Sequence, residues 1–182
     1  PGGKSLHMAE MLHGTGHVEA RDLTDYKVNL IWENIQRSRM QNIEAVRFDA
    51  TVLDEASVEK ADIVVADLPC SGLGILGKKT DLKYKMTEKT QEDLVVLQRD
   101  ILSKVKNYVK PGGNLVYSTC TIHKKENMDN VHWFLQENAD FELVSIKELL
   151  CDELKKDVME EGCLQFLPGV HESDGFFIAK FK

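Results

Sequence analysis

The chain has 182 residues, of which 42% are hydrophobic and 29% charged, a balance that fits one globular domain with a sizeable core. No apolar stretch approaches the roughly 18 residues needed to cross a bilayer and no signal-peptide pattern opens the chain, so we expect a cytoplasmic protein without a membrane partner. A net charge of −7 argues against a protein that grips nucleic acid over its whole surface.

The negative charge is concentrated late in the chain, where residues 140–161 carry a net charge of −5. An earlier segment is basic instead, with four lysines around one aspartate: Lys78, Lys79, Asp81, Lys83 and Lys85. A phosphate backbone could pass over this segment, although an ordinary solvated loop would explain the lysines equally well.

Helices alternate with short strands in the first part of the chain. The expected elements are a helix over 5–13, a strand over 17–20, a helix over 25–39, and strands over 45–48 and 62–66. Thr24 or Asp25 can cap the long helix, whose apolar residues recur at helical spacing. The β-branched run 62–66 is the clearest strand signal, and we expect this strand to be buried.

The second part of the chain continues the alternation. Its expected elements are a helix over 90–109, a strand over 115–118, a helix over 126–137, and strands over 141–144 and 176–181. The first of these helices should stop at Pro111-Gly112-Gly113. Strands that alternate with helices predict an α/β fold with a mostly parallel sheet and right-handed crossovers. No linker interrupts the order, so one domain is sufficient.

Two cysteines follow directly on predicted strands. Cys70 comes after the strand 62–66, and Cys120 comes after the strand 115–118. Residues just past the carboxyl ends of neighbouring parallel strands converge on one crevice, so the two thiols can share a site. A thiolate is a strong nucleophile, and a second thiol beside it can exchange protons with the intermediate that the first one forms. This pairing suits attack on an electron-poor pyrimidine ring.

The other two cysteines, Cys151 and Cys163, stand in no motif, and we expect both to be small buried side chains. The four cysteines form no CxxC pair and have no ligand-like spacing with the six histidines, so we expect no metal site. His171 lies in a loop that could face a substrate, although a solvent-exposed histidine is the more frequent outcome.

Four segments carry a family resemblance, in order and at plausible spacing: Pro1-Gly2-Gly3-Lys4, Asp67-Leu68-Pro69-Cys70-Ser71-Gly72, Ser118-Thr119-Cys120-Thr121 and Ser173-Asp174-Gly175-Phe176-Phe177-Ile178-Ala179. Together they resemble the motifs of the RNA cytosine-5 methyltransferases, most of all the bacterial RsmB (Sun, Fmu) family, which methylates small-subunit ribosomal RNA. Leu68 and Thr121 depart from the alanine and serine usual in that family, and both changes are conservative.

The resemblance implies a Rossmann-like class I methyltransferase sheet, mostly parallel with an antiparallel last strand. In the family, the Pro-Gly-Gly-Lys segment follows a first, central strand that is missing from this sequence. We therefore expect residues 1–182 to be the catalytic domain of a longer enzyme, truncated at its N-terminus and without the N-terminal RNA-binding domain.

The resemblance also implies an S-adenosyl-L-methionine site, formed by Pro1, Gly2, Gly3, Lys4, Asp22, Asp49 and Asp67. Glycines between a strand and a helix let the backbone approach a ligand closely. Asp22, after the second strand of the family's sheet, is placed to accept hydrogen bonds from a ribose diol, and Asp49 falls where family members contact adenine. Either aspartate could instead cap a turn or helix.

For catalysis, the resemblance assigns Cys120 as the nucleophile that attacks carbon 6 of cytosine, and Cys70 as the residue that assists elimination and release. Lys4 is the expected cation near the thiolate, and Asp67 the carboxylate that recognises the cytosine ring. Pro69 frames the substrate-facing loop, the local positive charge adds Lys78 and Lys79 as expected substrate-binding residues, and the family resemblance adds Asp81 and Lys83.

The expected substrate is single-stranded or loop RNA, because a base must leave its stack to reach such a crevice. We expect the protein to act as a monomer. Two alternatives remain open: a Rossmann-like methyltransferase with a small-molecule or protein substrate, and a non-catalytic RNA-binding remnant. The first would have no use for the two paired cysteines, and the second would bind the cofactor poorly.

Overall fold

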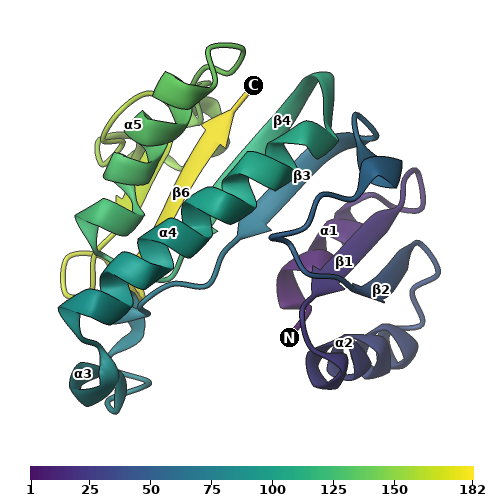
Figure 1. The fold of residues 1–182 in the computed structure, drawn as a ribbon, viewed down its shortest axis with the longest axis horizontal. Helices are drawn as coiled ribbons and strands as arrows, with labels where there is room; N and C mark the ends of the chain where they lie inside the picture. The colour runs from purple at the N-terminus through teal and green to yellow at the C-terminus, as the bar shows by residue number, and fades with distance from the viewer. The chain divides into compact units, whose positions relative to one another are not determined.

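The computed structural model describes the backbone of residues 1–182 and all side chains except those of Lys83 and Lys85. Contacts divide the chain into two compact units, Pro1–Val52 and Leu53–Lys182, and each is described by itself. The fold is α/β, with the strands in a two-stranded and a four-stranded sheet (Figure 1). Among the described residues, none of the helices combines the length and the apolar character that crossing a bilayer requires.

The first unit consists of α1 (Gly3–Met11), β1 (Val18–Asp22), α2 (Asp25–Ser38) and β2 (Ile43–Arg47). β1 and β2 are parallel neighbours, with Val18 opposite Ile43 and Asp22 opposite Arg47. Thr24 caps α2, since its side chain accepts a hydrogen bond from the backbone N–H of Lys27. All four elements were predicted, with boundaries that differ by at most two residues.

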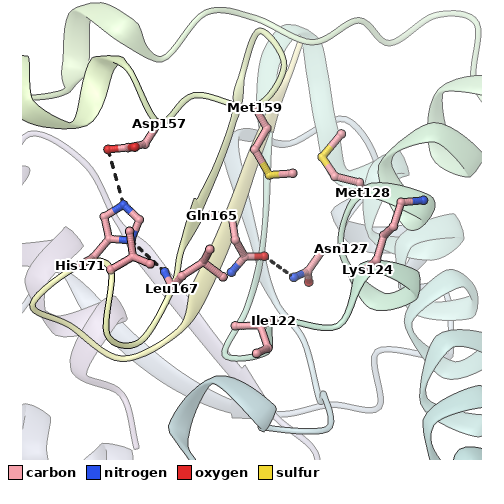
Figure 2. A pocket seen from close by; sticks show the side chains of 10 residues that line it. Ile122, Lys124, Asn127, Met128, Asp157, Met159, Gln165, Leu167 and His171 are labelled. Atoms are coloured by element: carbon pink, nitrogen blue, oxygen red, sulfur yellow. Dashed lines mark hydrogen bonds and ion pairs between the residues drawn. The ribbon is translucent and has the colours of Figure 1, made fainter.

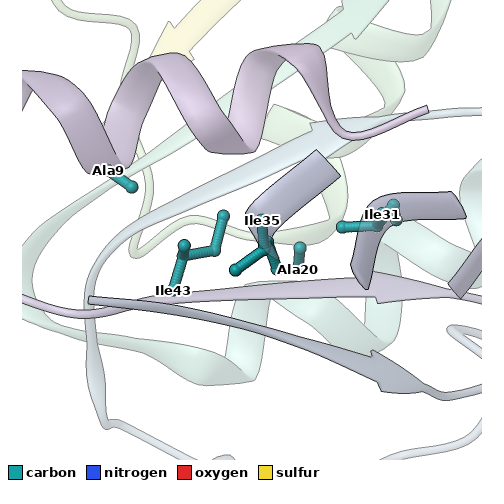
Figure 3. Packing of buried hydrophobic residues seen from close by; sticks show 5 residues of the cluster. All are labelled: Ala9, Ala20, Ile31, Ile35 and Ile43. Atoms are coloured by element: carbon teal, nitrogen blue, oxygen red, sulfur yellow. The ribbon is translucent and has the colours of Figure 1, made fainter. Parts of the chain in front are cut away.

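The core of this unit is small and aliphatic (Figure 3). Ala9 comes from α1, Ala20 from β1, Ile31 and Ile35 from α2, and Ile43 from β2, and each is at most 5% exposed. The two isoleucines of α2 are one helical turn apart, which places them on the same face of the helix. The helical spacing read from the sequence therefore identified the side of α2 that packs on the strands.

The second unit is built on a sheet with the strand order β3-β4-β6-β5. Its strands are β3 (Ala61–Asp67), β4 (Val109–Thr119), β5 (Cys163–Phe166) and β6 (Phe176–Phe181). Its α-helices are α3 (Leu82–Lys85), α4 (Glu88–Val105), α5 (Met128–Glu137) and α6 (Asp152–Lys155). Short 3₁₀ turns are η1 (Glu55–Ser57), η2 (Leu73–Ile75), η3 (Lys106–Tyr108), η4 (Lys124–Glu126) and η5 (Lys147–Leu149). β3 and β4 are parallel, whereas β6 is antiparallel to β4 and to β5. The predicted antiparallel last strand is thus confirmed.

The core of the second unit lies between this sheet and the helices α4 and α5, which run alongside each other across it (Figure 1). Its largest buried side chains are aromatic. Phe134 of α5 packs on Phe181 of β6 with ring centroids 4.8 Å apart, and Tyr117 of β4 meets Phe177 edge to face at 6.2 Å. All four side chains are at most 1% exposed, so this core fixes β4 and β6 in place beneath the helices.

Three expectations about the second unit were wrong in detail. The strand 62–66 is not buried: it is part of β3, at the edge of its sheet, and Ile63 is 60% exposed. The helix predicted to reach residue 109 ends at Val105, and a 3₁₀ turn leads directly into β4. Residues 141–144 form one isolated bridge, between Leu143 and Phe181, because the unpredicted β5 occupies most of that edge of β6.

Candidate active site

Two loops of the second unit meet at the carboxyl ends of β3 and β4. Asp67, the last residue of β3, lies opposite Ser118 of β4, so the two parallel strands end at the same level. The Ser118 hydroxyl donates a hydrogen bond of 2.8 Å to the Asp67 carboxylate, and the backbone N–H of Leu68 donates to the Ser118 carbonyl. The sheet register therefore places whatever follows Asp67 beside whatever follows Thr119.

The residues brought together by this register are Cys70 and Cys120, whose sulfur atoms lie 3.1 Å apart. The backbone N–H of Cys120 also points at the Cys70 sulfur, at 3.3 Å. Both side chains are partly exposed and both are free thiols. Two thiols at hydrogen-bonding distance, reachable from solvent and next to a carboxylate, form a constellation suited to nucleophilic chemistry.

The shared hydrogen bond makes the two cysteines electrostatically unequal. Acceptance of the Cys70 S–H bond is the main cause that lowers the pKa of Cys120 from 9.0 to about 7, and the positive charge of Lys79 acts in the same direction. Donation of that bond, together with burial, raises the pKa of Cys70 well above 9.0. Near neutral pH, Cys120 is therefore the thiolate of the pair, and Cys70 holds the proton.

Behind the two cysteines lies a buried polar cluster that the sequence analysis did not identify. Ser71 and Thr121, which directly follow the cysteines, are both fully buried, and their hydroxyls are 2.8 Å apart. Glu126, also fully buried, accepts hydrogen bonds from the Ser71 hydroxyl and backbone N–H and from the Gln98 amide. Glu126 stands in the charged run Lys124-Lys125-Glu126, which reads as surface, and nothing in the spacing of one sequence distinguishes it.

A third segment, which contains Gly175, packs against the cysteine loops at Gly74. The Gly74 N–H donates to the Cys120 carbonyl at 3.1 Å, and the Gly175 N–H donates to the Gly74 carbonyl at 2.8 Å. A Cβ atom added to Gly74 would lie 2.2 Å from the Gly175 carbonyl oxygen, a distance that two backbones cannot relieve by turning a side chain. The approach of these backbones therefore requires glycine at both positions.

The predicted cofactor residues other than Asp67 all lie in the first unit. Gly2 caps α1 with a φ of +85°, and a Cβ there would crowd Ile31 at 3.1 Å, so this turn requires glycine. An added Cβ at Gly3 would meet nothing within 4 Å. Lys4 is an exposed residue of α1, and its expected role beside the thiolate stays a prediction.

Asp22 and Asp49 follow the neighbouring parallel strands β1 and β2 at one edge of the first unit, where the Phe48 N–H donates to the Asp22 carbonyl. Asp22 accepts a 3.3 Å hydrogen bond from the Thr24 N–H. One oxygen of Asp49 accepts from the hydroxyl and the N–H of Thr51, and these bonds lower the pKa of Asp49. Each aspartate thus also stabilises its local turn.

The predicted substrate-binding residues lie around the loop that follows Cys70. Pro69, Lys78, Lys79 and Asp81 are exposed, and Lys78 forms an ion pair with Asp174. The side chain of Lys83, which was also predicted to bind substrate, lies outside the described residues. Lys78, Lys79 and Asp81 are therefore at the surface of the second unit, and the charge of Lys79 acts on Cys120.

The family model of the 16S rRNA methyltransferases RsmB/F matches residues 1–182. The chain belongs to this family. It is 39% identical to the probable ribosomal RNA small subunit methyltransferase B of Bacillus subtilis, over all of this chain and 41% of that protein. The chain spans about two fifths of the length of the curated relatives it matches.

Solved structures agree with the RsmB/F assignment. The crystal structure of PH0851 matches with a TM-score of 0.91 and 32% identity, over all of this chain and 40% of that one. The structure of NSun6 from Pyrococcus horikoshii with SFG matches with a TM-score of 0.79 and 28% identity, over all of this chain and 45% of that one. The predicted family and the predicted Rossmann-like methyltransferase fold are confirmed.

A pocket of about 370 Å³ lies beside the Cys120 loop of this RsmB/F member (Figure 2). Asn127 and Gln165 are hydrogen-bonded to each other at its wall, and both amides also donate to the Thr121 carbonyl. His171 borders the pocket with a side chain only 12% exposed, so the expectation of a solvent histidine was wrong. Its Nδ1 accepts from the Leu167 N–H, which holds the ring against the protein.

The two remaining cysteines differ from each other. Cys163, in β5, is fully buried, as predicted, and burial raises its pKa to about 12. Cys151 is exposed at the start of α6, so the prediction that it is buried was wrong. Leu150 and Cys151 form the two-residue connection between η5 and α6. Neither cysteine belongs to the site formed by Cys70 and Cys120.

Proposed function

We propose that this chain carries the catalytic centre of an S-adenosylmethionine-dependent RNA (cytosine-5) methyltransferase, which acts on small-subunit ribosomal RNA. The observation that carries the proposal is the 3.1 Å contact between the sulfurs of Cys70 and Cys120 at the carboxyl ends of two parallel strands. A methyltransferase acting on a small molecule or a protein has no evident use for such a pair. The ribosomal substrate is proposed from the names of the relatives.

The residues of the first unit fit the adenosyl cofactor. The strained turn at Gly2 and the open space at Gly3 leave the backbone accessible at the N-terminus of α1. Asp22 and Asp49 provide carboxylates at the edge where β1 and β2 end, which suits a ribose diol and the amino group of adenine. When bound, the cofactor supplies an electrophilic methyl group.

Cys120 is the nucleophile in the proposed mechanism. Its thiolate adds to carbon 6 of the cytosine ring, which makes carbon 5 nucleophilic and able to take the methyl group. A base then removes the carbon-5 proton, and the electron pair left behind expels Cys120 as a thiolate, which releases 5-methylcytosine. A pKa of about 7 supplies the thiolate at neutral pH, and the hydrogen bond from Cys70 is the principal reason for that value.

Cys70 and Asp67 serve the other steps of this mechanism. Cys70 holds a proton 3.1 Å from the attacking sulfur, so its S–H can stabilise the Cys120 thiolate as the bond to carbon 6 breaks. Asp67 is oriented by Ser118 at the edge of the same crevice, where its carboxylate can accept hydrogen bonds from the exocyclic amine of cytosine and from the ring nitrogen once that is protonated during the attack. Uracil presents a different hydrogen-bond pattern at those positions, so Asp67 would select cytosine.

Trapping of a covalent complex tests this proposal. The Cys70→Ala variant, incubated with small-subunit ribosomal RNA and S-adenosylmethionine, should accumulate a protein–RNA adduct that resists denaturing electrophoresis. The Cys120→Ala variant should form no adduct and no 5-methylcytosine, and Cys151→Ala is the matched control. An adduct that persists in Cys120→Ala would contradict the assignment of the nucleophile. Calorimetric titration with S-adenosylmethionine tests cofactor binding separately.

A further inference from the structure

Glu126 is a fully buried carboxylate that the proposed mechanism does not use. Its oxygen Oε2 accepts hydrogen bonds of 2.9 Å from the Ser71 N–H and from the Gln98 amide. Its oxygen Oε1 accepts a short hydrogen bond from the Ser71 hydroxyl and lies 3.2 Å from Nδ1 of His123. Taking a carboxylate out of water is costly, and hydrogen bonds to both oxygens offset that cost for Glu126. Glu126 therefore differs from the exposed charged residues beside it, Lys124 and Lys125.

The hydrogen bonds of Glu126 reach the residues next to both cysteines. Ser71 follows Cys70 and bonds to Glu126 through both its backbone and its side chain. The Ser71 hydroxyl also lies 2.8 Å from the hydroxyl of Thr121, which follows Cys120. Glu126 is thus one bond from the first cysteine loop and two bonds from the second.

Two neighbours hold this cluster from behind. Gln98 of α4 donates to the Pro69 carbonyl at 2.8 Å, as well as to Glu126, so it secures the residue just before Cys70. Tyr117 of β4 donates from its buried hydroxyl to the Glu126 carbonyl. Glu126 is consequently held through its carboxylate by α4 and through its backbone carbonyl by β4.

We propose that Glu126, acting through Ser71 and Thr121, is the positioning residue that sets the distance between the sulfurs of Cys70 and Cys120. The proposal rests on the proposed function for its catalytic meaning, although the distance itself is measurable without any RNA. A carboxylate is the suitable side chain, because it only accepts hydrogen bonds and here faces donors on both oxygens. A misplacement of about 1 Å between reacting groups can reduce a rate about a hundredfold, so small loop movements matter.

The rate of thiol–disulfide exchange depends on the distance between the two sulfurs, so it tests this proposal without RNA. The Cys120 thiolate attacks one sulfur of 4,4′-dithiodipyridine and releases one thiopyridone. The Cys70 thiol then gives its proton to the buffer and displaces the second thiopyridone, which leaves a Cys70–Cys120 disulfide. The rate of the second release reports how well the two sulfurs are aligned. A Cys151→Ser background removes the exposed competing thiol, and Cys163 is buried.

In this background, Glu126→Gln should slow the second release by about ten- to a hundredfold, because an amide places N–H donors against the donors of Ser71 and Gln98. The matched control is Glu137→Gln, an exposed glutamate at the end of α5, the helix that follows Glu126, and it should leave the rate unchanged. A folded Glu126→Gln variant with an unchanged second release would overturn the proposal.

Two milder variants keep the test decisive if Glu126→Gln fails to fold. Ser71→Ala and Thr121→Val each remove one hydroxyl of the bridge with little change in volume, and each should slow the second release several-fold. Unchanged rates in both would overturn the proposal, whatever Glu126→Gln does. If the protein exchanges thiols at the normal rate but Cys70→Ala forms no adduct with RNA, the proposed function is contradicted and the proposed role of Glu126 is not. The failure of one proposal is therefore distinguishable from the failure of the other.

Discussion

Cys70 and Cys120 lie 3.1 Å apart where two parallel strands end, whereas Cys151 is exposed beside a short helix and Cys163 is enclosed in the core. The first two share a hydrogen bond and have pKa values displaced in opposite directions. In Cys163 burial is the main cause that raises the pKa, and the negative charge of Glu160 acts in the same direction. The comparison shows that the acidity of a thiol here depends on its place in the fold, since the same side chain has a lowered pKa in Cys120 and a raised pKa in Cys70 and Cys163.

The largest expected difference is between Cys120 and Cys163 in their alkylation by iodoacetamide. With pKa values of about 7 and about 12, the thiolate fraction at pH 7 differs on the order of 10⁴-fold. The Cys120 rate should rise with pH through a midpoint near 7 and then level off, because deprotonation creates the nucleophile. Peptide mapping by mass spectrometry measures the alkylation of each cysteine. Equal alkylation rates for Cys120 and Cys163 would contradict the described difference between them.

A smaller effect is expected when the partner of Cys120 is removed. Cys70→Ala deletes the hydrogen bond that is the main cause of the lowered pKa, so the alkylation midpoint of Cys120 should move back toward 9.0. The alkylation rate at pH 7 should then fall by about tenfold or more. Cys151→Ala is the control and should leave the midpoint in place. An unshifted midpoint in Cys70→Ala would mean that another group sets the acidity of Cys120.

The smallest effects concern stability. Cys163→Ser replaces a fully buried thiol by a hydroxyl, which costs about 1–3 kcal/mol when it finds no hydrogen-bond partner. Cys151→Ser, at an exposed position, should change the free energy of unfolding by at most about 0.5 kcal/mol. Urea denaturation measures both. Similar losses in the two variants would show that the exposed and the buried position do not differ as described.

Local signals in the sequence located most of the elements. The β-branched run before Asp67 and the capped helix after Thr24 both appear close to their expected places. The strand β5 could not be foreseen, because Cys163–Phe166 is short and follows an acidic stretch without alternation. Which of the two segments forms a strand depends on pairing with β6. Since β5 pairs along most of β6, residues 142–144 pair only with its final residues.

The candidate site, like the fold, was predicted only in part. The positions of Cys70 and Cys120 after two strands predicted that their thiols share a crevice, and the structure places the sulfurs in contact. The supporting residues Glu126 and Gln98 were not predicted, because their burial depends on how α4 and η4 pack against the cysteine loops. The roles of Lys4, Asp22 and Asp49 stay predictions, and each needs a binding measurement of its own.

The crossing of Gly74 and Gly175 restricts how this centre can be re-engineered. Even a methyl group at Gly74 would press on the backbone that supports Cys120, so libraries aimed at a new RNA sequence preference should leave both glycines unvaried. An added Cβ at Gly77, a few residues further on, would meet nothing within 4 Å, and the exposed Lys78 and Lys79 follow it. Substitutions at Gly77 and Lys78 would alter the exposed surface beside the two cysteines, whereas a change at Lys79 would also remove a charge that lowers the pKa of Cys120.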